Sequence, residues 1–443
     1  MERYSEYKDS GVKWLGEIPS HWGVVRIKNV ANMFGRIGFR GYTADDLVEE
    51  GAGAITLSPT NIIDGELDFT NCSYLSWNKY YESPEIMVKA GDVVLVKTAS
   101  VGKCALVRSL PKETTVNPQF LVFKNIVANS AFFTYILQDY IQCFLDSEKN
   151  GSTIPTISQQ IIGNFKIMLP PRTEQDSIVR YLDAATLKID KAIAMQQKMI
   201  DLLNERKQII IQNAVTKGLD ENVEMKDSNC KFLGKIPSTW EVCKTLYVLS
   251  MPITDGPHTT PQLYDDGIPF VSAEAVSCGN GYIDFSHIRG YISDSFYNEC
   301  CKKYIPQRDD IYMIKSGATT GKVAIVNTDV KFTIWSPLAV FRVNKKKVLP
   351  YFLYYSLQSS YYQLQVQDKW SFGTQQNIGM RMLEKLILCY PSIEEQAKIV
   401  AFIKKNVDNF DSAITNCQRQ IALLQERKQI IINEVVTGKV KVS

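Results

Sequence analysis

"LLNERKQIIIQNAVT", Leu202–Thr216, returns as "LLQERKQIIINEVVT", Leu423–Thr437, in a chain of 443 residues. The two copies lie 221 positions apart and differ at only four of their 15 positions. Neither contains Gly or Pro, and the Leu, Glu, Arg, Lys and Gln that dominate them favour a helix. A helical stretch that is repeated at such a distance indicates the duplication of a much larger unit.

Other segments recur in the same order and at nearly the same distance. The pairs are YKDSGVKWLGEIPSHW (Tyr7–Trp22) with MKDSNCKFLGKIPSTW (Met225–Trp240), GDVVLVKTASVGKCALV (Gly91–Val107) with DDIYMIKSGATTGKVAIV (Asp309–Val326), and TEQDSIV (Thr173–Val179) with EEQAKIV (Glu394–Val400). Their offset changes only from 218 to 221 along the chain. Solenoid repeats are much shorter, so we interpret the chain as one module of about 220 residues that is present twice.

Each module has two parts. The first, of about 165 residues, mixes short β-rich runs such as DVVLVK with turns rich in Gly, Pro, Asn and Asp. A helix is expected at Ser130–Ser147 and at its counterpart, Leu349–Gln365. The second part is one long helix. The chain is therefore divided into a mixed α/β domain at 1–168, a helix at 169–218, a second domain at 219–388 and a second helix at 389–443.

Both long helices carry start and stop signals. The first follows Pro170–Pro171, and the second begins near Ser392, which forms a capping-box pattern with Glu395. Gly218 and Gly438 stand just past the ends, where a residue of positive φ is expected. Each helix should span about 43 residues and measure roughly 65 Å.

Apolar or small residues recur along both helices at alternating spacings of four and three, a period of 3.5 that is typical of a coiled coil. They are Ile178, Leu182, Ala185, Ile189, Ala192, Met199, Leu203 and Ile210 in the first helix, and Ile399, Ile403, Phe410, Ala413, Leu424 and Ile431 in the second. The alternative is a helix packed on its own domain. It is less favoured, because a helix of roughly 65 Å is longer than a domain of about 165 residues.

Chain connectivity constrains how the helices can pair. Only Lys217–Glu224 joins the first helix to the second module, so the second domain must lie near the far end of that helix. Its own helix can bury its apolar seam by running back along the first. The sequence predicts an α+β protein in which two long helices form an antiparallel coiled coil between two mixed α/β domains. The internal duplication should give it approximate two-fold symmetry.

Composition and charge exclude few partners. The net charge of +3 and the pI near 8.2 neither announce nor exclude a nucleic-acid binder, because local patches decide. The N-terminus resembles no signal peptide, and no apolar run reaches the roughly 18 residues of a membrane span. Ten Cys without a C-x-x-C pair fit reduced thiols, so a cytoplasmic protein without membrane contact is expected. His21, His258 and His287 are far apart and predict no metal site.

Three motifs only resemble catalytic ones. GATTGKV (Gly317–Val323) and SVGKC (Ser100–Cys104) lack the spacing and the Ser or Thr of a phosphate-binding loop. We interpret them as β-turns with Gly102 and Gly321 at positive φ. NPQF at Asn117 is similar to an amino-methyltransferase signature, but its third residue is Gln119 and no Gly-rich cofactor loop precedes it. The sequence therefore predicts no catalytic site.

Polar and basic residues instead gather in Gly-rich loops of both modules. Arg and Lys read guanine edges or neutralise phosphates, and Asn and Gln read adenine. The candidate DNA-contacting residues are Arg36, Arg40, Lys97, Lys103, Lys149, Ser152 and Thr153 in the first module, and His258, Thr259, Thr260, Lys315, Thr319, Thr320, Lys322, Thr374, Gln375, Gln376 and Asn377 in the second. Any one of them could be a solvated loop residue. Their recurrence at matched positions favours a binding role.

The chain resembles the specificity subunit of type I restriction-modification systems along nearly its whole length. The segments that carry the resemblance are Tyr7–Trp22, Leu202–Leu219, TDGPHTTPQLYDDGIPFV (Thr254–Val271), SFGTQQNIGMRML (Ser371–Leu383) and PSIEEQAKIVAFI (Pro391–Ile403). The resemblance implies two target-recognition domains, each of which binds one half of a split DNA site. It implies helices that separate these domains and dock methyltransferase subunits. One departure is Met225–Trp240, where Phe232 replaces the Trp14 of the first copy.

The resemblance also implies partners and cofactors. The partners are double-stranded DNA, two methyltransferase subunits that modify adenine N6, and a motor-nuclease subunit. S-adenosylmethionine would be bound by the methyltransferase, and ATP and Mg²⁺ by the motor-nuclease subunit. This chain is then expected to bind no cofactor and to catalyse no reaction by itself. The alternatives are a coiled-coil scaffold that binds no DNA and, less favoured, a self-contained DNA methyltransferase.

Overall fold

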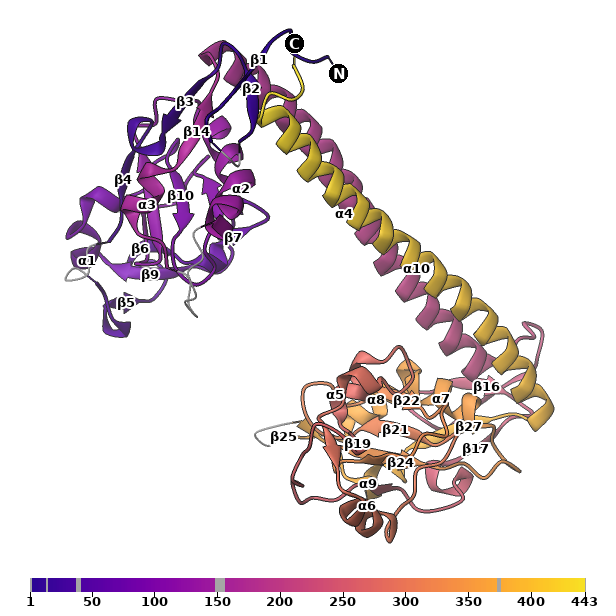
Figure 1. Cartoon of the computed structure of the whole chain (residues 1–443). Coiled ribbons are helices and arrows are strands. Elements are labelled where there is room, and N and C mark those ends of the chain that lie inside the picture. The colour runs from indigo at the N-terminus through magenta and orange to yellow at the C-terminus, as the bar shows by residue number, and fades with distance from the viewer. Residues whose placement is uncertain (1, 13–14, 37–40, 148–155, 373–375, 443) are drawn as a thin grey trace. The chain divides into compact units, whose positions relative to one another are not determined.

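The computed structural model describes residues 2–12, 15–36, 41–147, 156–372 and 376–442. The chain divides into two compact units, whose elements are labelled in Figure 1. Unit 1 comprises Met1–Gln196 and Arg419–Ser443, and unit 2 comprises Gln197–Gln418. Each unit contains a mixed α/β region and part of both long helices. No helix in the described part of the chain is long and apolar enough to span a membrane.

Unit 1 is built around a four-stranded antiparallel sheet of order β11-β10-β13-β4. Its strands are β4 (Asn32–Phe34), β10 (Val93–Val96), β11 (Cys104–Leu106) and β13 (Phe120–Lys124). All four residues of β10 are buried, which explains its continuous run of Val and Leu. The helix α2 (Ser130–Ser147) has the predicted bounds and packs against β11.

A second sheet and several short elements complete the α/β region of unit 1. The sheet has the order β12-β6-β9-β5, and its β12–β6 pair is parallel. Its strands are β5 (Leu47–Val48), β6 (Gly53–Leu57), β9 (Ser73–Ser76) and β12 (Thr114–Val116). The remaining elements are β1 (Tyr7–Asp9) with β2 (Glu17–Pro19), β3 (Gly23–Arg26) with β14 (Lys166–Leu169), β7 (Ile62–Ile63) with β8 (Glu66–Leu67), α1 (Trp77–Tyr81) and α3 (Gln159–Asn164).

Unit 2 repeats this order around the sheet β18-β24-β21-β22. The strands are β18 (Thr254–Asp255), β21 (Ile311–Ile314), β22 (Val323–Ile325) and β24 (Leu338–Phe341), and its second sheet joins β19 (Ile268–Val271), β20 (Tyr291–Ile292) and β23 (Thr333–Ile334). The strand pairs are β15 (Met225–Asp227) with β16 (Lys235–Pro237), β17 (Glu241–Lys244) with β27 (Ile387–Tyr390), and β25 (Ser371–Phe372) with β26 (Gln376–Asn377). The short helices are α5 (Ala273–Cys278), α6 (Asp294–Cys301), α7 (Pro350–Gln358), α8 (Ser360–Asp368) and α9 (Met380–Leu383).

One helix prediction is wrong in unit 2. The single helix expected at Leu349–Gln365 is two helices, α7 and α8, which meet at Ser359 in an extended conformation. The buried Ser359 hydroxyl donates to the Ser356 carbonyl at 2.5 Å. A local Ser bond of this kind competes with the helical hydrogen-bond pattern, which explains why the chain breaks there.

The two predicted long helices are present as α4 (Arg172–Lys217) and α10 (Ile393–Val436). In unit 1, Lys428 Nζ lies 2.7 Å from Asp190 Oδ1, and Gln196 Nε2 donates to Gln420 Oε1 at 2.8 Å. In unit 2, Lys207 Nζ lies 2.6 Å from Asp411 Oδ1. Contact positions rise along α4 as they fall along α10. The two helices therefore pack antiparallel, as predicted (Figure 1).

The period predicted for the apolar seam is wrong in detail. Met199 is 49% exposed, whereas its neighbour Ile200 is only 7% exposed. The buried isoleucines of α4 follow a spacing of 11 residues: Ile178, Ile189, Ile200 and Ile211. The matching positions of α10 are buried or half-buried: Ile399, Phe410, Ile421 and Ile432. An 11-residue period equals about 3.67 residues per turn, close to a straight helix, so it does not impose the left-handed supercoil of a 3.5-residue seam.

The start of each long helix is fixed to the α/β region of its own module by a Glu-Gln pair. In unit 1, Trp22 Nε1 donates to Glu174 Oε2 at 2.9 Å. The buried Gln175 accepts from Asn129 N at 2.7 Å and donates to Pro170 O at 2.8 Å. In unit 2, Trp240 donates to Glu395, and the buried Gln396 accepts from Leu349 N and donates to Pro391 O. A buried amide whose bonds are satisfied fixes the direction in which the helix leaves.

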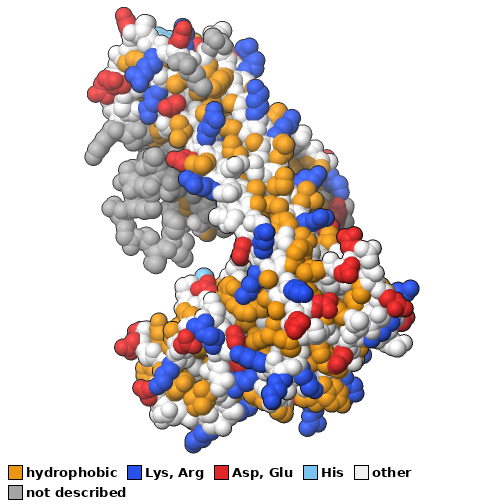
Figure 2. Space-filling view, turned by 90° about the vertical axis from the view of Figure 1, so that its right-hand side faces the viewer, with side chains coloured by type: hydrophobic (Ala, Val, Ile, Leu, Met, Phe, Trp, Pro, Cys, Tyr) orange, Lys and Arg blue, Asp and Glu red, His pale blue; other side chains and the backbone are white. Residues whose placement is uncertain are grey.

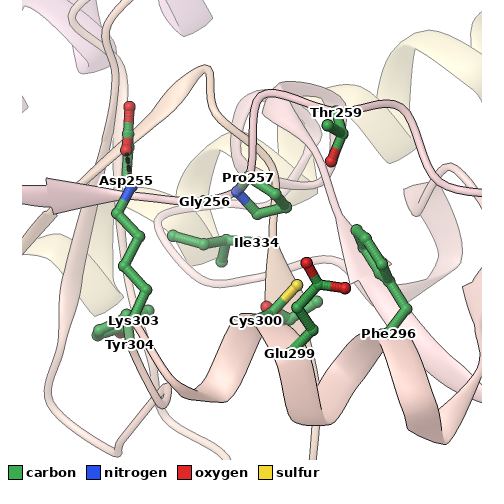
Figure 3. Close-up of a pocket in the computed structure, with 11 residues that line it drawn as sticks. Asp255, Gly256, Pro257, Thr259, Phe296, Glu299, Cys300, Lys303, Tyr304 and Ile334 are labelled. Atoms are coloured by element: carbon green, nitrogen blue, oxygen red, sulfur yellow. Dashed lines mark hydrogen bonds and ion pairs between the residues drawn. The ribbon is translucent and has the colours of Figure 1, made fainter.

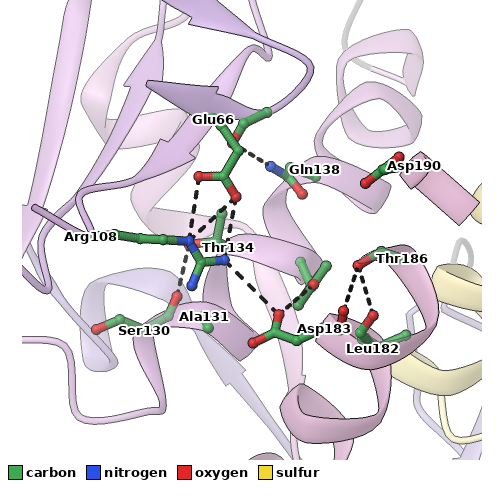
Figure 4. A network of polar contacts seen from close by, with 12 residues as sticks. Glu66, Arg108, Ser130, Ala131, Thr134, Gln138, Leu182, Asp183, Thr186 and Asp190 are labelled. Atoms are coloured by element: carbon green, nitrogen blue, oxygen red, sulfur yellow. Dashed lines mark hydrogen bonds and ion pairs between the residues drawn. The ribbon is translucent and has the colours of Figure 1, made fainter. Parts of the chain in front are cut away.

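A polar network further along α4 is not shared by the two units. In unit 1, Arg108 lies 3.3 Å from Glu66 and 4.0 Å from Asp183, and the Tyr135 hydroxyl donates to Asp183 at 2.7 Å (Figure 4). Burial and the Asp183 carboxylate raise the pKa of Tyr135. The position of α10 that matches Asp183 is Lys404, whose ammonium lies 3.4 Å from the Tyr351 ring centroid. The matching helix position thus carries a negative charge in unit 1 and a positive charge in unit 2.

The end of each long helix packs on the Trp of the other module. Gly218 and Gly438 have φ of 76° and 72°, as predicted for residues just past a helix end. A Cβ on Gly438 would lie 3.0 Å from Trp22 and 2.6 Å from Pro19, and a Cβ on Gly218 would lie 3.4 Å from Trp240. The last turns are buried in the same cores: Ile432, Val435 and Val436 in unit 1, and Ile211, Ala214 and Val215 in unit 2.

We predict that Gly438→Ala destabilises the protein more than Gly218→Ala does. Both substitutions place an L residue at positive φ, which costs about 1 kcal/mol, but only Gly438 faces contacts below 3.0 Å to a rigid Pro ring. Gly11→Ala is the control, because Gly11 has φ of 66° and no atom within 4 Å of a Cβ. Melting temperatures should fall in the order Gly11→Ala, Gly218→Ala, Gly438→Ala. Equal losses for all three would show that the close contacts of Gly438 with Pro19 and Trp22 contribute nothing.

Candidate nucleic-acid interface

Both units carry the same hairpin at one end of the central sheet. In unit 1 it connects β10 to β11 through Lys97–Lys103, and in unit 2 it connects β21 to β22 through Lys315–Lys322. Gly102 N donates to Val96 O at 3.0 Å, and Gly321 N donates to Ile314 O at 2.8 Å. Gly102 and Gly321 have φ of 98° and 95°, so the β-turn interpretation of these motifs is confirmed.

The first lysine of each hairpin is the point where three chain segments meet. Lys97 N donates to Gln119 O at 2.7 Å, and Lys97 O accepts from Ile157 N at 2.9 Å. In unit 2, Lys315 N donates to Pro337 O at 2.7 Å, and Lys315 O accepts from Ile378 N at 2.9 Å. The backbone frame is therefore the same in both units. The side chains attached to it differ.

In unit 2 this frame brings together many of the predicted residues. Ser316 forms an antiparallel bridge with Asn377, and Gly317 N donates to Gln376 O at 3.0 Å. The Thr320 hydroxyl donates to Gly317 O at 2.7 Å. Gln376, Asn377 and Lys322 are exposed, and Thr319 and Thr320 are half-buried. Polar side chains from the hairpin and from β26 thus share one end of the sheet.

Asp255 lies at the end of β18 and contacts two lysine side chains and one histidine side chain. It is 1% exposed, and its carboxylate lies 2.5 Å from Lys303, 3.3 Å from Lys315 and 3.2 Å from His258. Burial alone would raise the pKa of Asp255, but the Lys303 and Lys315 ammonium groups hold it below its usual value. Asp255 was not among the predicted residues, although the segment TDGPHTT that contains it was.

A small cavity adjoins Asp255. It has a volume of about 130 Å³ and is lined by Gly256, Thr259, Phe296, Glu299 and Cys300, among others (Figure 3). Figure 3 shows Lys303 reaching Asp255 along one wall. Cofactor and drug sites usually exceed about 300 Å³, so this cavity is smaller than such sites. His258, which is 72% exposed, and Thr260 lie on the surface beside it.

Arg36 is buried, unlike the exposed candidates of unit 2. It is 5% exposed, and its Nη2 contacts Thr115 Oγ1 at 3.4 Å and Val116 O at 3.5 Å. The guanidinium also lies 5.2 Å from the Tyr42 ring centroid. Burial lowers the pKa of Arg36. Its observed contacts are internal, so the structure gives it a role in packing β12 rather than an exposed position.

The other predicted residues fall into two groups. Lys103 is exposed in the unit 1 hairpin, and Lys97 is half-buried at its base. The residues that lie outside the described part of the chain are Arg40, Lys149, Ser152, Thr153, Thr374 and Gln375. Contact of any of the predicted residues with DNA stays a prediction.

The sequence of the turn Asn117–Gln119 resembles only a methyltransferase motif, but the structure places this turn beside Lys97. Asn117 Nδ2 donates to Gln119 Oε1, and Gln119 N donates to Asn117 Oδ1, both at 2.9 Å. This mutual bonding holds both side chains on the turn between β12 and β13. Amide side chains fixed in this way suit base-edge recognition, so Gln119 joins the candidates. The backbone bond between Lys97 and Gln119 could not be read from the sequence.

The side chains that converge at this end of the sheet are suited to binding. Among the residues that the structure describes, no group of three or more His, Cys, Asp or Glu side chains could hold a metal ion. The convergent groups are ammonium, hydroxyl and amide groups, which suit phosphates and base edges. That this chain binds no cofactor stays a prediction.

Comparisons with known proteins identify the family to which the chain belongs. The family model described as "Type I restriction modification DNA specificity domain" matches residues 19–199 and 259–425. A putative type I restriction enzyme MjaX specificity subunit from Methanocaldococcus jannaschii is 26% identical, with 98% of each chain covered. The MjaVIII specificity subunit from the same organism is 25% identical, with 98% of this chain and 97% of the relative covered.

A solved structure shares the fold. It comes from work on complex assembly and conformational transition of the type I R-M system, and it has a TM-score of 0.67 and 17% sequence identity. The comparison covers 96% of this chain and 99% of the other. The family match spans most of this chain in two regions, one in each module, as the duplication requires. The chain belongs to the family of type I restriction-modification DNA specificity subunits.

Proposed function

We propose that each α/β domain reads one half of a bipartite, asymmetric target in double-stranded DNA. The observation that carries this proposal is the duplicated frame at Lys97 and Lys315, which holds unlike side chains in the two units. A shared frame supports a shared mode of docking, and unlike side chains support unlike half-sites. The chain itself would catalyse nothing. The methyltransferase subunits would supply S-adenosylmethionine and adenine-N6 methylation, and the motor-nuclease subunit would supply ATP and Mg²⁺.

The long helices are proposed to dock two methyltransferase subunits. Exposed apolar side chains occur on the helix segments of both units: Leu187, Met195, Leu423 and Ile430 in unit 1, and Met199, Leu202, Ile209 and Phe402 in unit 2. Figure 2 shows hydrophobic side chains beside Lys and Arg side chains on the exposed helix faces. Exposed apolar groups that are bordered by polar ones are typical of protein-binding surfaces. One such surface in each unit supports two partner subunits.

Exchange of one domain should change one half-site only. Replacing Met1–Leu169 with the matching domain of another family member leaves the frame of unit 2 untouched. Methylome sequencing of a host that expresses the complete system should then show one new half-site and one retained half-site. Exchange of 219–388 is the reciprocal control. If either exchange altered both half-sites, separate reading by the two domains would be refuted.

Lengthening both helices should lengthen the gap between the half-sites. Four residues, about one turn, add roughly 6 Å of rise, and a base pair rises about 3.4 Å. Matched insertions between Ala194 and Met195 and between Ala422 and Leu423 should add one or two base pairs to the gap. Replacing four exposed residues there, without an insertion, is the control. An unchanged gap in the methylome of the insertion variant would mean that the helices do not set the spacing.

Charge on the exposed helix face should weaken methyltransferase binding. The double variant Leu187→Glu with Leu423→Glu is expected to reduce the affinity of the purified methyltransferase by more than about tenfold, because it buries carboxylates at an apolar contact. Ile63→Glu is the control, since Ile63 is 52% exposed in the same unit but lies on β7. Titration calorimetry measures both. Equal affinities for the double variant and the control would remove this face from the docking surface.

A further inference from the structure

Gly35 and Asp255 occupy equivalent positions in the two units. Phe34 pairs with Val122 in β13, and Thr254 pairs with Val340 in β24. Val122 and Val340 match, because each pairs with the second residue of the central strand. The next residue along the edge strand is Gly35 in unit 1 and Asp255 in unit 2. A carboxylate of unit 2 is therefore replaced by a glycine in unit 1.

Lys97 packs directly over Gly35. A Cβ built on Gly35 would lie 3.2 Å from Lys97 Nζ, so the ammonium occupies the space that a side chain would otherwise fill. In unit 2 the Lys315 ammonium lies 3.3 Å from Asp255 Oδ2 in the corresponding place. The first lysine of each hairpin thus faces the same backbone position, but only Lys315 meets a carboxylate there.

The Lys97 ammonium makes no hydrogen bond or ion pair with any residue that the structure describes. It is half-buried, and burial lowers the pKa of Lys97. A partly desolvated cation without an anion is unfavourable, and an incoming anion would restore the missing interaction. The exposed Lys103 lies at the other end of the same hairpin and adds positive charge.

We propose that Lys97 binds a phosphate of the DNA backbone, and that Lys315 makes no such contact because Asp255 neutralises it. The inference rests on the proposed function, since it assigns DNA as the anion. It adds an asymmetry between the two units. Unit 1 contacts the backbone through its hairpin lysine, whereas unit 2 uses its lysine to hold Asp255 beside His258 and Lys303.

The salt dependence of DNA binding tests this assignment. Each neutralised phosphate contributes about 0.9 to the slope of log affinity against log salt. The full chain in complex with its methyltransferase is titrated against two duplexes, one with the methylome-defined target and one of random sequence. Lys97→Gln and Gly35→Asp should each lower the slope by about 0.9 on both duplexes. Their affinity deficit relative to wild type should therefore shrink by roughly three- to fourfold between 50 and 200 mM salt.

Two matched variants keep the result interpretable. Gly35→Asn fills the same space as Gly35→Asp without its charge, so it should lose less of the slope than Gly35→Asp does. Lys315→Gln removes the equivalent lysine of unit 2 and should retain the wild-type slope. An unchanged slope in a folded Lys97→Gln protein, or an equal loss in Lys315→Gln, overturns the assignment. A changed target sequence with an unchanged slope would make Lys97 a base contact and also overturns it. If the wild-type complex bound the target and the random duplex equally well, the proposed function would be refuted. The Lys97 assignment would still be tested, because the slope on random duplex is measured separately.

Discussion

In each unit one buried Trp, Trp22 or Trp240, connects the α/β region to both long helices. In unit 1 the indole nitrogen holds Glu174 at the start of α4, and the indole ring packs on Gly438 at the end of α10. In unit 2 Trp240 does the same for Glu395 and Gly218. Each Trp therefore binds the start of one long helix and the end of the other. This explains why the segments around the two tryptophans recur with the helices, since each segment must accept both helix ends.

The 11-residue spacing of the buried isoleucines follows from the same requirement. A helix that is fixed to a core at its start must still present an apolar face to its partner several turns later. A period of about 3.67 residues per turn keeps that face nearly constant along a straight helix, whereas a 3.5-residue period requires supercoiling. Ile178 and Ile211 show this directly, because each belongs to the core of its own unit. The same 11-residue pattern thus places isoleucines both in the domain cores and between the two helices.

At the hairpin end of the central sheet, the two units share the same backbone hydrogen bonds but carry different side chains. Backbone hydrogen bonds at Lys97 connect the hairpin to the turn before β13 and to the segment that contains Ile157. Those at Lys315 connect it to the turn before β24 and to the segment that contains Ile378. Main-chain bonds depend little on side-chain identity, so replacing Gly35 by Asp255 changes charge without moving the frame. The two units of one chain therefore share the backbone frame and differ in the side chains that it carries.

The sequence alone was enough to predict the duplication, the two long helices, their antiparallel pairing and the family. These features follow from local patterns and from identity over many residues: Gly218 and Gly438 mark helix ends because few other residues adopt positive φ cheaply. It could not determine the burial of Arg36, the break at Ser359 or the shift from Met199 to Ile200. Each of these depends on which distant atoms fill the space around a residue. The joining of Asp255 to Lys303 and Lys315, and its replacement by Gly35 beside Lys97, likewise appeared only in the tertiary structure, because strand register decides which side chains meet.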